Sequence, residues 1–168
     1  IEGVEFSVAS AMASTDAAGT ARLVQLGNGN RATLQTDPAS MPDITLAPVN
    51  RGVEIVPRPG RFHVTDFPIV ALSELEGTVT FADDASRRGV SGLRLQLRNA
   101  TGQIAGTVRS ERGGYYFFEQ IRPGHYALVI EEEQARRLGV CLSSPVAVDI
   151  PATGEFITRD LEVVNCSS

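Results

Sequence analysis

The sequence predicts an all-β protein made of two tandem small β-sandwich domains, Ig-like or prealbumin-like, with one short helix in the second. Apolar and polar residues alternate with period two in short runs, most clearly over residues 93–98. Turn residues separate these runs, as in the segments 16–19, 28–30, 99–102 and 123–124. No long segment has the 3.6-residue period of a helix. Short strands joined by such turns are typical of β-sandwiches.

A domain boundary is predicted between residues 71 and 72. A proline-rich stretch runs from Pro38 to Pro68, and a new set of strands begins at Leu75. We therefore expect one domain over residues 1–71 and a second over residues 72–168, each near the lower size limit for an independent core. The chain starts without an initiator methionine or a leader, so we expect an excised or processed piece of a longer protein.

The strands of the first domain are predicted where apolar residues recur at every second position. These positions lie in residues 4–8, 53–55 and 62–64. In the second domain the same pattern predicts strands over residues 93–97, 115–119 and 126–130, with Tyr116, Phe118 and Ile121 pointing inward. Residues 146–150 and 156–164 are predicted to pair as a hairpin.

A helix of about two turns is predicted over residues 131–138. Its first turn is acidic and its last turn carries Arg136 and Arg137, which suits the helix dipole, and Gly139 follows as a stop signal. We interpret this helix as a connector between strands, and a docking helix is the alternative.

Composition excludes several classes of function. The net charge is −5, so a nucleic-acid binder is not expected. All 15 basic residues are arginine, which excludes Schiff bases, Ser–Lys dyads, P-loop lysines and the Lys–Asn isopeptide cross-link of some pilins. The two histidines and two cysteines lack zinc-ligand spacing, and neither Asp83-Asp84 nor the run 131–133 has the frame of a calcium loop. We expect no catalytic residues, no metal, no cofactor and no enzymatic activity.

A disulfide between Cys141 and Cys166 is predicted from the register of the expected hairpin. If Ile150 lies opposite a residue near Phe156, the two cysteines fall opposite each other just beyond the strand ends. Such a bond indicates an oxidising compartment. The alternative is two buried free thiols in a cytosolic protein.

An aromatic stripe in the second domain is the candidate partner-binding surface. Tyr115 and Phe117 point away from the core, and His125, Ala127 and Val129 are their expected neighbours across the turn at 123–124. The expected polar rim consists of Arg109, Arg112 and Arg122. The alternative is that the first domain or the helix covers this stripe.

Two further groups of polar residues lie in the first domain. Arg58 and Arg61 bracket a Pro-Gly turn and could hold a carboxylate, although solvated turn residues are the simpler interpretation. His63 is expected at the surface.

Two resemblances go beyond these patterns. Residues 114–126, GYYFFEQIRPGHY, resemble the signature of prealbumin-like β-sandwiches, including carboxypeptidase regulatory-like domains, which indicates fold rather than function. Residues 15–21, 34–37, 41–43 and 56–62, with Phe67, resemble in their order the first C-terminal periplasmic domain of fimbrial outer-membrane ushers.

The usher resemblance implies non-catalytic protein-binding modules in the periplasm. They would be attached to an outer-membrane protein and would engage chaperone–pilin subunit complexes or other envelope proteins, with no nucleic acid and no membrane-spanning segment of their own. The alternative is a cell-surface adhesion or stalk module, with glycan contact as an option.

Overall fold

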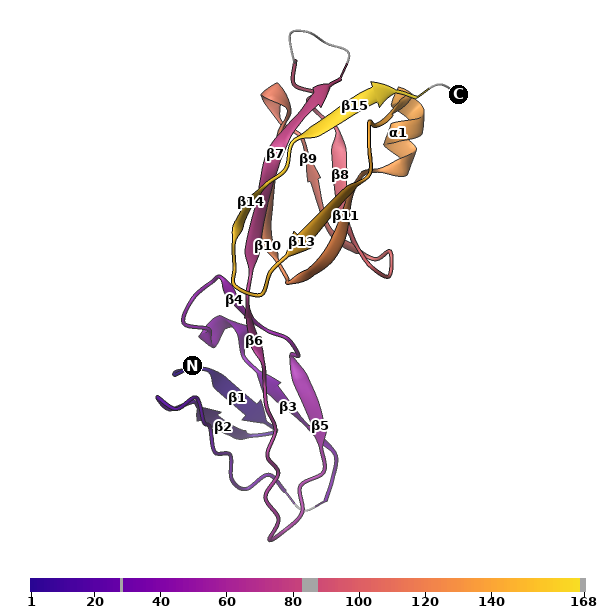
Figure 1. Cartoon of the computed structure of the whole chain (residues 1–168). Helices are drawn as coiled ribbons and strands as arrows, with labels where there is room; N and C mark the ends of the chain where they lie inside the picture. The colour runs from indigo at the N-terminus through magenta and orange to yellow at the C-terminus, as the bar shows by residue number, and fades with distance from the viewer. Residues whose placement is uncertain (28, 83–87, 167–168) are drawn as a thin grey trace. The chain divides into compact units, whose positions relative to one another are not determined.

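The computed structural model describes residues 1–27, 29–82 and 88–166. Its contacts divide the chain into two compact units, Ile1–Val70 and Ala71–Ser168, which are treated separately below (Figure 1). Regular structure in the described residues is strand apart from one α-helix and two short 3₁₀ segments, η1 (Pro38–Ser40) and η2 (Arg112–Gly114). The predicted all-β class, with its single short helix, is confirmed.

Unit 1 is built on a four-stranded antiparallel sheet of order β2-β1-β3-β5, and β4 pairs with β6. Its strands are β1 (Glu5–Val8), β2 (Ala11–Ser14), β3 (Ala32–Thr36), β4 (Leu46–Pro48), β5 (Gly52–Ile55) and β6 (Ile69–Ala71). One face is apolar because alternate residues of β1 point to it, and Phe6 packs edge-on against Phe67 with ring centroids 5.0 Å apart.

The strand predicted over residues 62–64 is wrong. These residues belong to no strand, and Phe62 and Val64 are 87% and 92% exposed. Their alternation is real, but no neighbouring strand in the described part of the chain supplies the hydrogen bonds that a sheet requires.

Unit 2 is a sandwich of two sheets (Figure 1). One sheet has the order β10-β7-β15-β12, with β14 also paired to β7, and the other has the order β13-β11-β8-β9. Its elements are β7 (Ser73–Phe81), β8 (Arg94–Asn99), β9 (Ile104–Arg109), β10 (Tyr115–Ile121), β11 (Gly124–Ile130), α1 (Glu132–Leu138), β12 (Val140–Leu142), β13 (Val146–Ile150), β14 (Phe156–Thr158) and β15 (Leu161–Asn165).

The core of unit 2 lies between these two sheets. Leu95 and Leu97 of β8 and Leu128 of β11 face Leu75 and Val79 of β7, and all five side chains are at most 1% exposed. Tyr116, Phe118 and Ile121 are buried with them, as predicted. Burial of this many apolar side chains is the main stabilising contribution in a small sandwich.

The predicted hairpin of residues 146–150 with 156–164 is wrong. β13 pairs with β11, whereas β14 and β15 both run parallel to β7 in the opposite sheet. The 151–155 connection therefore crosses from one sheet to the other instead of making a tight turn. The alternation of apolar residues shows which side of a strand is buried but does not show which strand lies beside it.

The step from β14 to β15 packs directly against β7. The amide of Arg159 donates to the carbonyl of Glu76, and the carboxylate of Asp160 accepts hydrogen bonds from the amide and hydroxyl of Thr78. Between them Gly77 lies so close that a Cβ atom placed on it would be 1.8 Å from the carbonyl oxygen of Arg159. A glycine is therefore needed at this point of β7.

Candidate interaction surfaces

Three aromatic side chains lie on the outer face of the sheet that contains β10. Tyr115 and Phe117 point outward from β10, as predicted, and the ring of Phe117 lies 6.3 Å from that of Phe156 on β14. Tyr115 is 39% exposed and Phe156 is 59% exposed. We call these three residues the aromatic patch. Sequence reasoning missed Phe156, although its alternation with the buried Ile157 was a usable signal.

The aromatic patch has an acidic border. The Tyr115 hydroxyl donates a 2.8 Å hydrogen bond to the carboxylate of Glu76 on the neighbouring strand β7. This bond raises the pKa of Tyr115, because the carboxylate stabilises the protonated phenol. The glutamates that point outward from this sheet are Glu74, Glu76, Glu119 and Glu162.

The predicted neighbours of Tyr115 and Phe117 lie elsewhere. His125, Ala127 and Val129 point outward from β11, which belongs to the other sheet of the sandwich. The Pro123-Gly124 turn leads from one sheet to the other, so the structure does not bring the predicted stripe together as one surface. A role in partner binding remains a prediction for each of these residues.

The predicted arginine rim is also divided. Arg109 lies on β9, opposite Arg94 of β8, and therefore shares the outer face of His125 and Val129. Arg112 lies in η2, just before β10. Arg122 lies in the turn between the sheets, where its carbonyl accepts a 2.9 Å hydrogen bond from the Tyr126 hydroxyl. The His125 ring nitrogen is 2.6 Å from the Asp149 carboxylate of β13.

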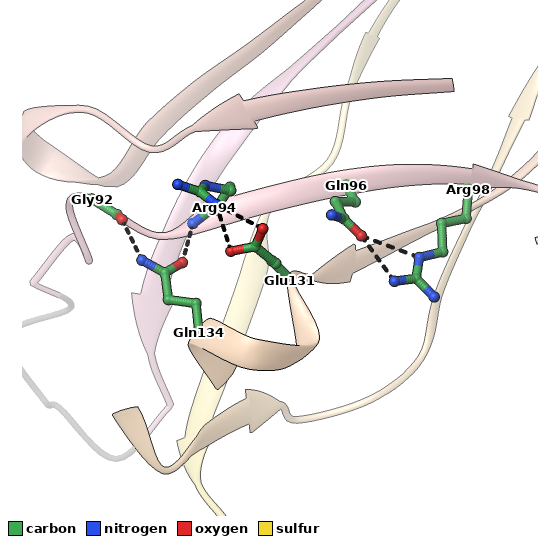
Figure 2. Close-up of polar contacts among 6 residues, drawn as sticks. All are labelled: Gly92, Arg94, Gln96, Arg98, Glu131 and Gln134. Atoms are coloured by element: carbon green, nitrogen blue, oxygen red, sulfur yellow. Dashed lines mark hydrogen bonds and ion pairs between the residues drawn. The ribbon is translucent and has the colours of Figure 1, made fainter. Parts of the chain in front are cut away.

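The helix α1 is fixed to the start of β8 by one buried glutamine (Figure 2). The Gln134 side-chain oxygen accepts a 2.5 Å hydrogen bond from the Arg94 amide, and its amino group donates a 2.9 Å bond to the Gly92 carbonyl. Gln134 is 9% exposed. The position of α1 between β11 and β12 agrees with its interpretation as a connector.

The outer face of β8 carries a row of polar side chains beside this helix (Figure 2). Arg94 binds both carboxylate oxygens of Glu131 at 2.7 and 2.9 Å, and Arg98 donates two hydrogen bonds to the side-chain oxygen of Gln96. This outer face carries Arg94, Arg98 and Arg109 together with the carboxylates of Glu131 and Asp149, whereas the opposite face carries glutamates. The two outer faces of unit 2 therefore differ in charge.

Cys141 and Cys166 form a disulfide, as predicted. Cys141 lies in β12, which pairs with β15, and Cys166 follows directly after β15. The amide of Cys166 also donates a 2.7 Å hydrogen bond to the carbonyl of Gly139. The bond thus joins β12 to the end of β15, and not the two strands from which it was predicted.

In unit 1, Arg58, Arg61 and His63 line a cavity with a volume of about 930 Å³. All three residues are exposed. The cavity lies over the apolar face of the β2-β1-β3-β5 sheet, where Val4, Phe6 and Val8 form part of its lining.

Within the described residues, no cluster of histidine, cysteine or carboxylate side chains could hold a metal ion. Asp83-Asp84, for which the sequence predicts no calcium loop, lies outside the described residues. In that part of the chain no helix is long and apolar enough to cross a membrane.

Comparison with known proteins relates unit 2 to Gram-positive surface proteins. Residues 79–143 match the SdrD B-like domain family. A segment of 49 residues, 29% of this chain, is 29% identical to the serine-aspartate repeat-containing protein C of Staphylococcus aureus, for example in strains MRSA252 and Newman. The chain spans about 5% of the length of these curated relatives.

Solved structures with similar coordinates include two from Gram-positive bacteria. The minor pilin GBS52 of Streptococcus agalactiae matches with a TM-score of 0.47 and 14% identity, over 100% of this chain and 86% of that one. The Bacillus anthracis TIE protein matches with a TM-score of 0.46 and 16% identity, over 97% of this chain and 31% of that one.

These matches correct the usher resemblance. Residues 79–143 of unit 2 match an SdrD B-like domain and not a usher-associated domain, so the periplasmic, outer-membrane and chaperone–subunit expectations are not supported. A β-sandwich module at the bacterial cell surface is what the comparisons support. Modules of this type are structural, which agrees with the expectation that the chain is not an enzyme.

Proposed function

We propose that the chain is a stalk module of a bacterial cell-surface protein, which holds attached parts at a distance from the cell and resists stretching. The observation that carries this proposal is the match of residues 79–143 to the SdrD B-like domain family, within a unit whose first and last strands are paired in parallel. This was the alternative that the sequence analysis left open.

The strand order of unit 2 suits this function. β15 pairs with β7 through Leu161 and Val79, and through two further residue pairs, while β14 adds three more pairs along the same strand. Because β7 and β15 are parallel, pulling the two ends of unit 2 apart slides one strand along the other. The hydrogen bonds between them then share the force, whereas in a peeled hairpin they would break one after another.

The disulfide complements this arrangement. Without lysine, the chain has no Lys–Asn cross-link available to it. The Cys141–Cys166 bond supplies a covalent link between β12 and the residue that leaves β15. Tension that arrives at Cys166 is therefore shared between β15 and β12, which strengthens the end of the unit where the force enters.

Single-molecule stretching of the full chain tests the proposal. One preparation is pulled through its two ends, and a matched preparation is pulled from an attachment at the exposed Thr101, in the β8–β9 turn, to the C-terminal end. We expect a clearly higher unfolding force for unit 2 in the first geometry, because only that geometry shears β7 against β15. Equal forces in the two geometries would contradict a stalk function.

A second candidate function is contact between copies of the chain at the cell surface. It is favoured by the different charges of the two outer faces of unit 2. One face carries Glu74, Glu76 and Glu119, and the other carries Arg98 and Arg109. The aromatic patch would lie at the centre of such a contact, where arginine can stack on its rings. A contact between two different faces can repeat without closing, which would produce rows of molecules.

Sedimentation of the full chain at low and high salt tests this second function. We expect weak self-association that salt suppresses and that the double substitution Tyr115→Ser/Phe117→Ser removes. The matched control is Ile44→Ser/Val49→Ser, which deletes two exposed apolar side chains of unit 1 that do not line its cavity. A chain that stays monomeric at millimolar concentration and low salt would show that these faces do not meet.

A further inference from the structure

The cavity of unit 1 has an apolar floor. Phe6 and Val8 of β1 and the preceding Val4 line it, together with Leu34 of β3 and Ile55 of β5. Its volume of about 930 Å³ lies in the upper part of the range that ligand sites occupy. A cavity of this size above one face of a sheet leaves room for a further layer of side chains.

Two irregular segments form the walls of the cavity. Residues 21–27 and 62–67 line it, and neither segment belongs to a strand or a helix. Between described residues, neither segment forms a backbone hydrogen bond. The backbone amides and carbonyls of these segments are therefore available to another chain in extended conformation, which supplies both kinds of partner at once.

The walls of the cavity also carry exposed apolar side chains, which favour an occupant with apolar side chains of its own. Phe62 and Val64 are almost fully exposed, and Val24 is 58% exposed. All three residues line the cavity. A gathering of exposed apolar side chains around one opening is typical of a surface that another molecule covers.

The charge around the cavity is opposite to that of the unit as a whole. Residues 1–70 contain 5 arginines and 7 acidic residues, a net charge of −2. Three of those arginines, Arg22, Arg58 and Arg61, line the cavity, whereas Asp66 is the acidic residue among its lining side chains. The lining therefore has a net charge of +2 and favours an anionic occupant.

We propose that this cavity, here called the unit 1 groove, binds an extended peptide segment with alternating apolar side chains and carboxylates near its ends. Its backbone pairs with residues 21–27 or 62–67, its apolar side chains cover β1, and its carboxylates bind Arg58 and Arg61. A fatty acid shares the apolar tail and the carboxylate, but it cannot pair with the unbonded backbone of the walls. The inference is independent of the proposed stalk function, because it concerns unit 1 alone.

The experiment uses the full chain and a synthetic peptide of about eight residues, the length of an ordinary strand, in which valine and threonine alternate between terminal aspartates. Amide hydrogen exchange and binding calorimetry are measured with this peptide, with a version that carries terminal lysines, and with decanoate. The charge-reversal variant is Arg58→Glu/Arg61→Glu. The matched control is Arg31→Glu/Arg51→Glu, which reverses the two arginines of unit 1 that do not line the groove.

We expect the aspartate peptide to slow amide exchange in residues 21–27 or 62–67. We also expect its affinity to fall about tenfold in the charge-reversal variant and to change little in the control. The lysine peptide is expected to prefer the charge-reversal variant.

Three results would overturn the proposal. The first is unchanged exchange in both wall segments at millimolar peptide, and the second is an equal loss of affinity in the control variant. The third is binding of decanoate without binding of the peptide, which would identify a lipid site instead.

Discussion

The hydroxyl of Tyr116 donates a hydrogen bond to the main-chain carbonyl of Arg159, at the step where the chain passes from β14 to β15. Tyr116 is 1% exposed, so this bond is made within the core of unit 2. It fixes the connection between two strands that both run parallel to β7.

Substitution Gly77→Ala is expected to destabilise unit 2 by about 3 kcal/mol or more. The new methyl group would overlap with the carbonyl oxygen of Arg159, which belongs to the main chain and cannot rotate away. The control is Gly106→Ala in β9, where the nearest atom is 3.2 Å away on the side chain of Phe118. Urea denaturation measures both variants. A loss of similar size in the two variants would contradict the close approach at Gly77.

Substitution Tyr116→Phe is expected to cost about 1–2 kcal/mol of unfolding free energy, because the Arg159 carbonyl loses its partner inside the core. Tyr126→Phe removes a solvent-exposed hydrogen bond to the Arg122 carbonyl, and should cost less. Denaturation at neutral pH separates the two values. Equal stabilities of Tyr116→Phe and the parent chain would show that the hydroxyl contributes nothing to the fold.

Stability should fall as the pH rises above 10. Burial raises the pKa of Tyr116 above its ordinary value of 10, with the nearby carboxylate of Asp160 as a smaller cause. The unfolded state therefore loses this proton first, so the contribution is fully present below pH 10 and is lost above it, by at most about 1.4 kcal/mol per pH unit. Denaturation one pH unit below and one above this value measures the loss.

The variant Tyr116→Phe is the control for this pH dependence. It should lose less stability over the same interval, although the raised pKa values of Tyr115 and Tyr126 leave part of the effect in place. An identical decline in the variant would show that Tyr116 is not the group responsible.

The double substitution Cys141→Ser/Cys166→Ser should lower the unfolding free energy by about 3.5 kcal/mol, because the bond closes a loop of 25 residues that is otherwise free in the unfolded chain. Reduction of the parent chain should have the same effect, and the variant should not respond to reductant. Thermal unfolding with and without reductant measures both. A parent chain that is indifferent to reductant would contradict this contribution.

Substitution Gln134→Ala should loosen α1, because the Arg94 amide and the Gly92 carbonyl both lose their partner. We expect a loss of about 2 kcal/mol and faster exchange of the Arg94 amide. The control is Glu133→Ala, an exposed residue of the same helix, which should leave that amide protected. Unchanged exchange at Arg94 in Gln134→Ala would show that this glutamine does not hold the helix in place.

Much of unit 2 could be predicted from the sequence, because the signals for a strand or a helix lie in neighbouring residues. Alternation identifies the buried side of β8 and β10, and the charges of residues 131–138 with Gly139 identify α1. The pairing of strands could not be obtained in this way. Residues 123–124 and 151–155 look like hairpin turns, yet both lead to the other sheet, because the choice of neighbour depends on the packing of the whole sandwich.

The disulfide was predicted correctly, although the strand pairing used to predict it was wrong. Its register was taken from strands at 146–150 and 156–164, which lie in different sheets. The two cysteines meet because the short strand β12 pairs with β15 instead, an element too short for its pattern to be recognised. The divided partner stripe has the same origin, since Tyr115 and His125 were assigned to one sheet.

The Cys141–Cys166 bond also sets how far the chain can lengthen under tension. When unit 2 has unfolded and the bond is oxidised, a pull on the C-terminal end passes directly from Cys166 to Cys141, so the residues between them are not extended. That span of 25 residues corresponds to about 85 Å of extended chain. The unfolded chain therefore reaches further after the bond is reduced than before.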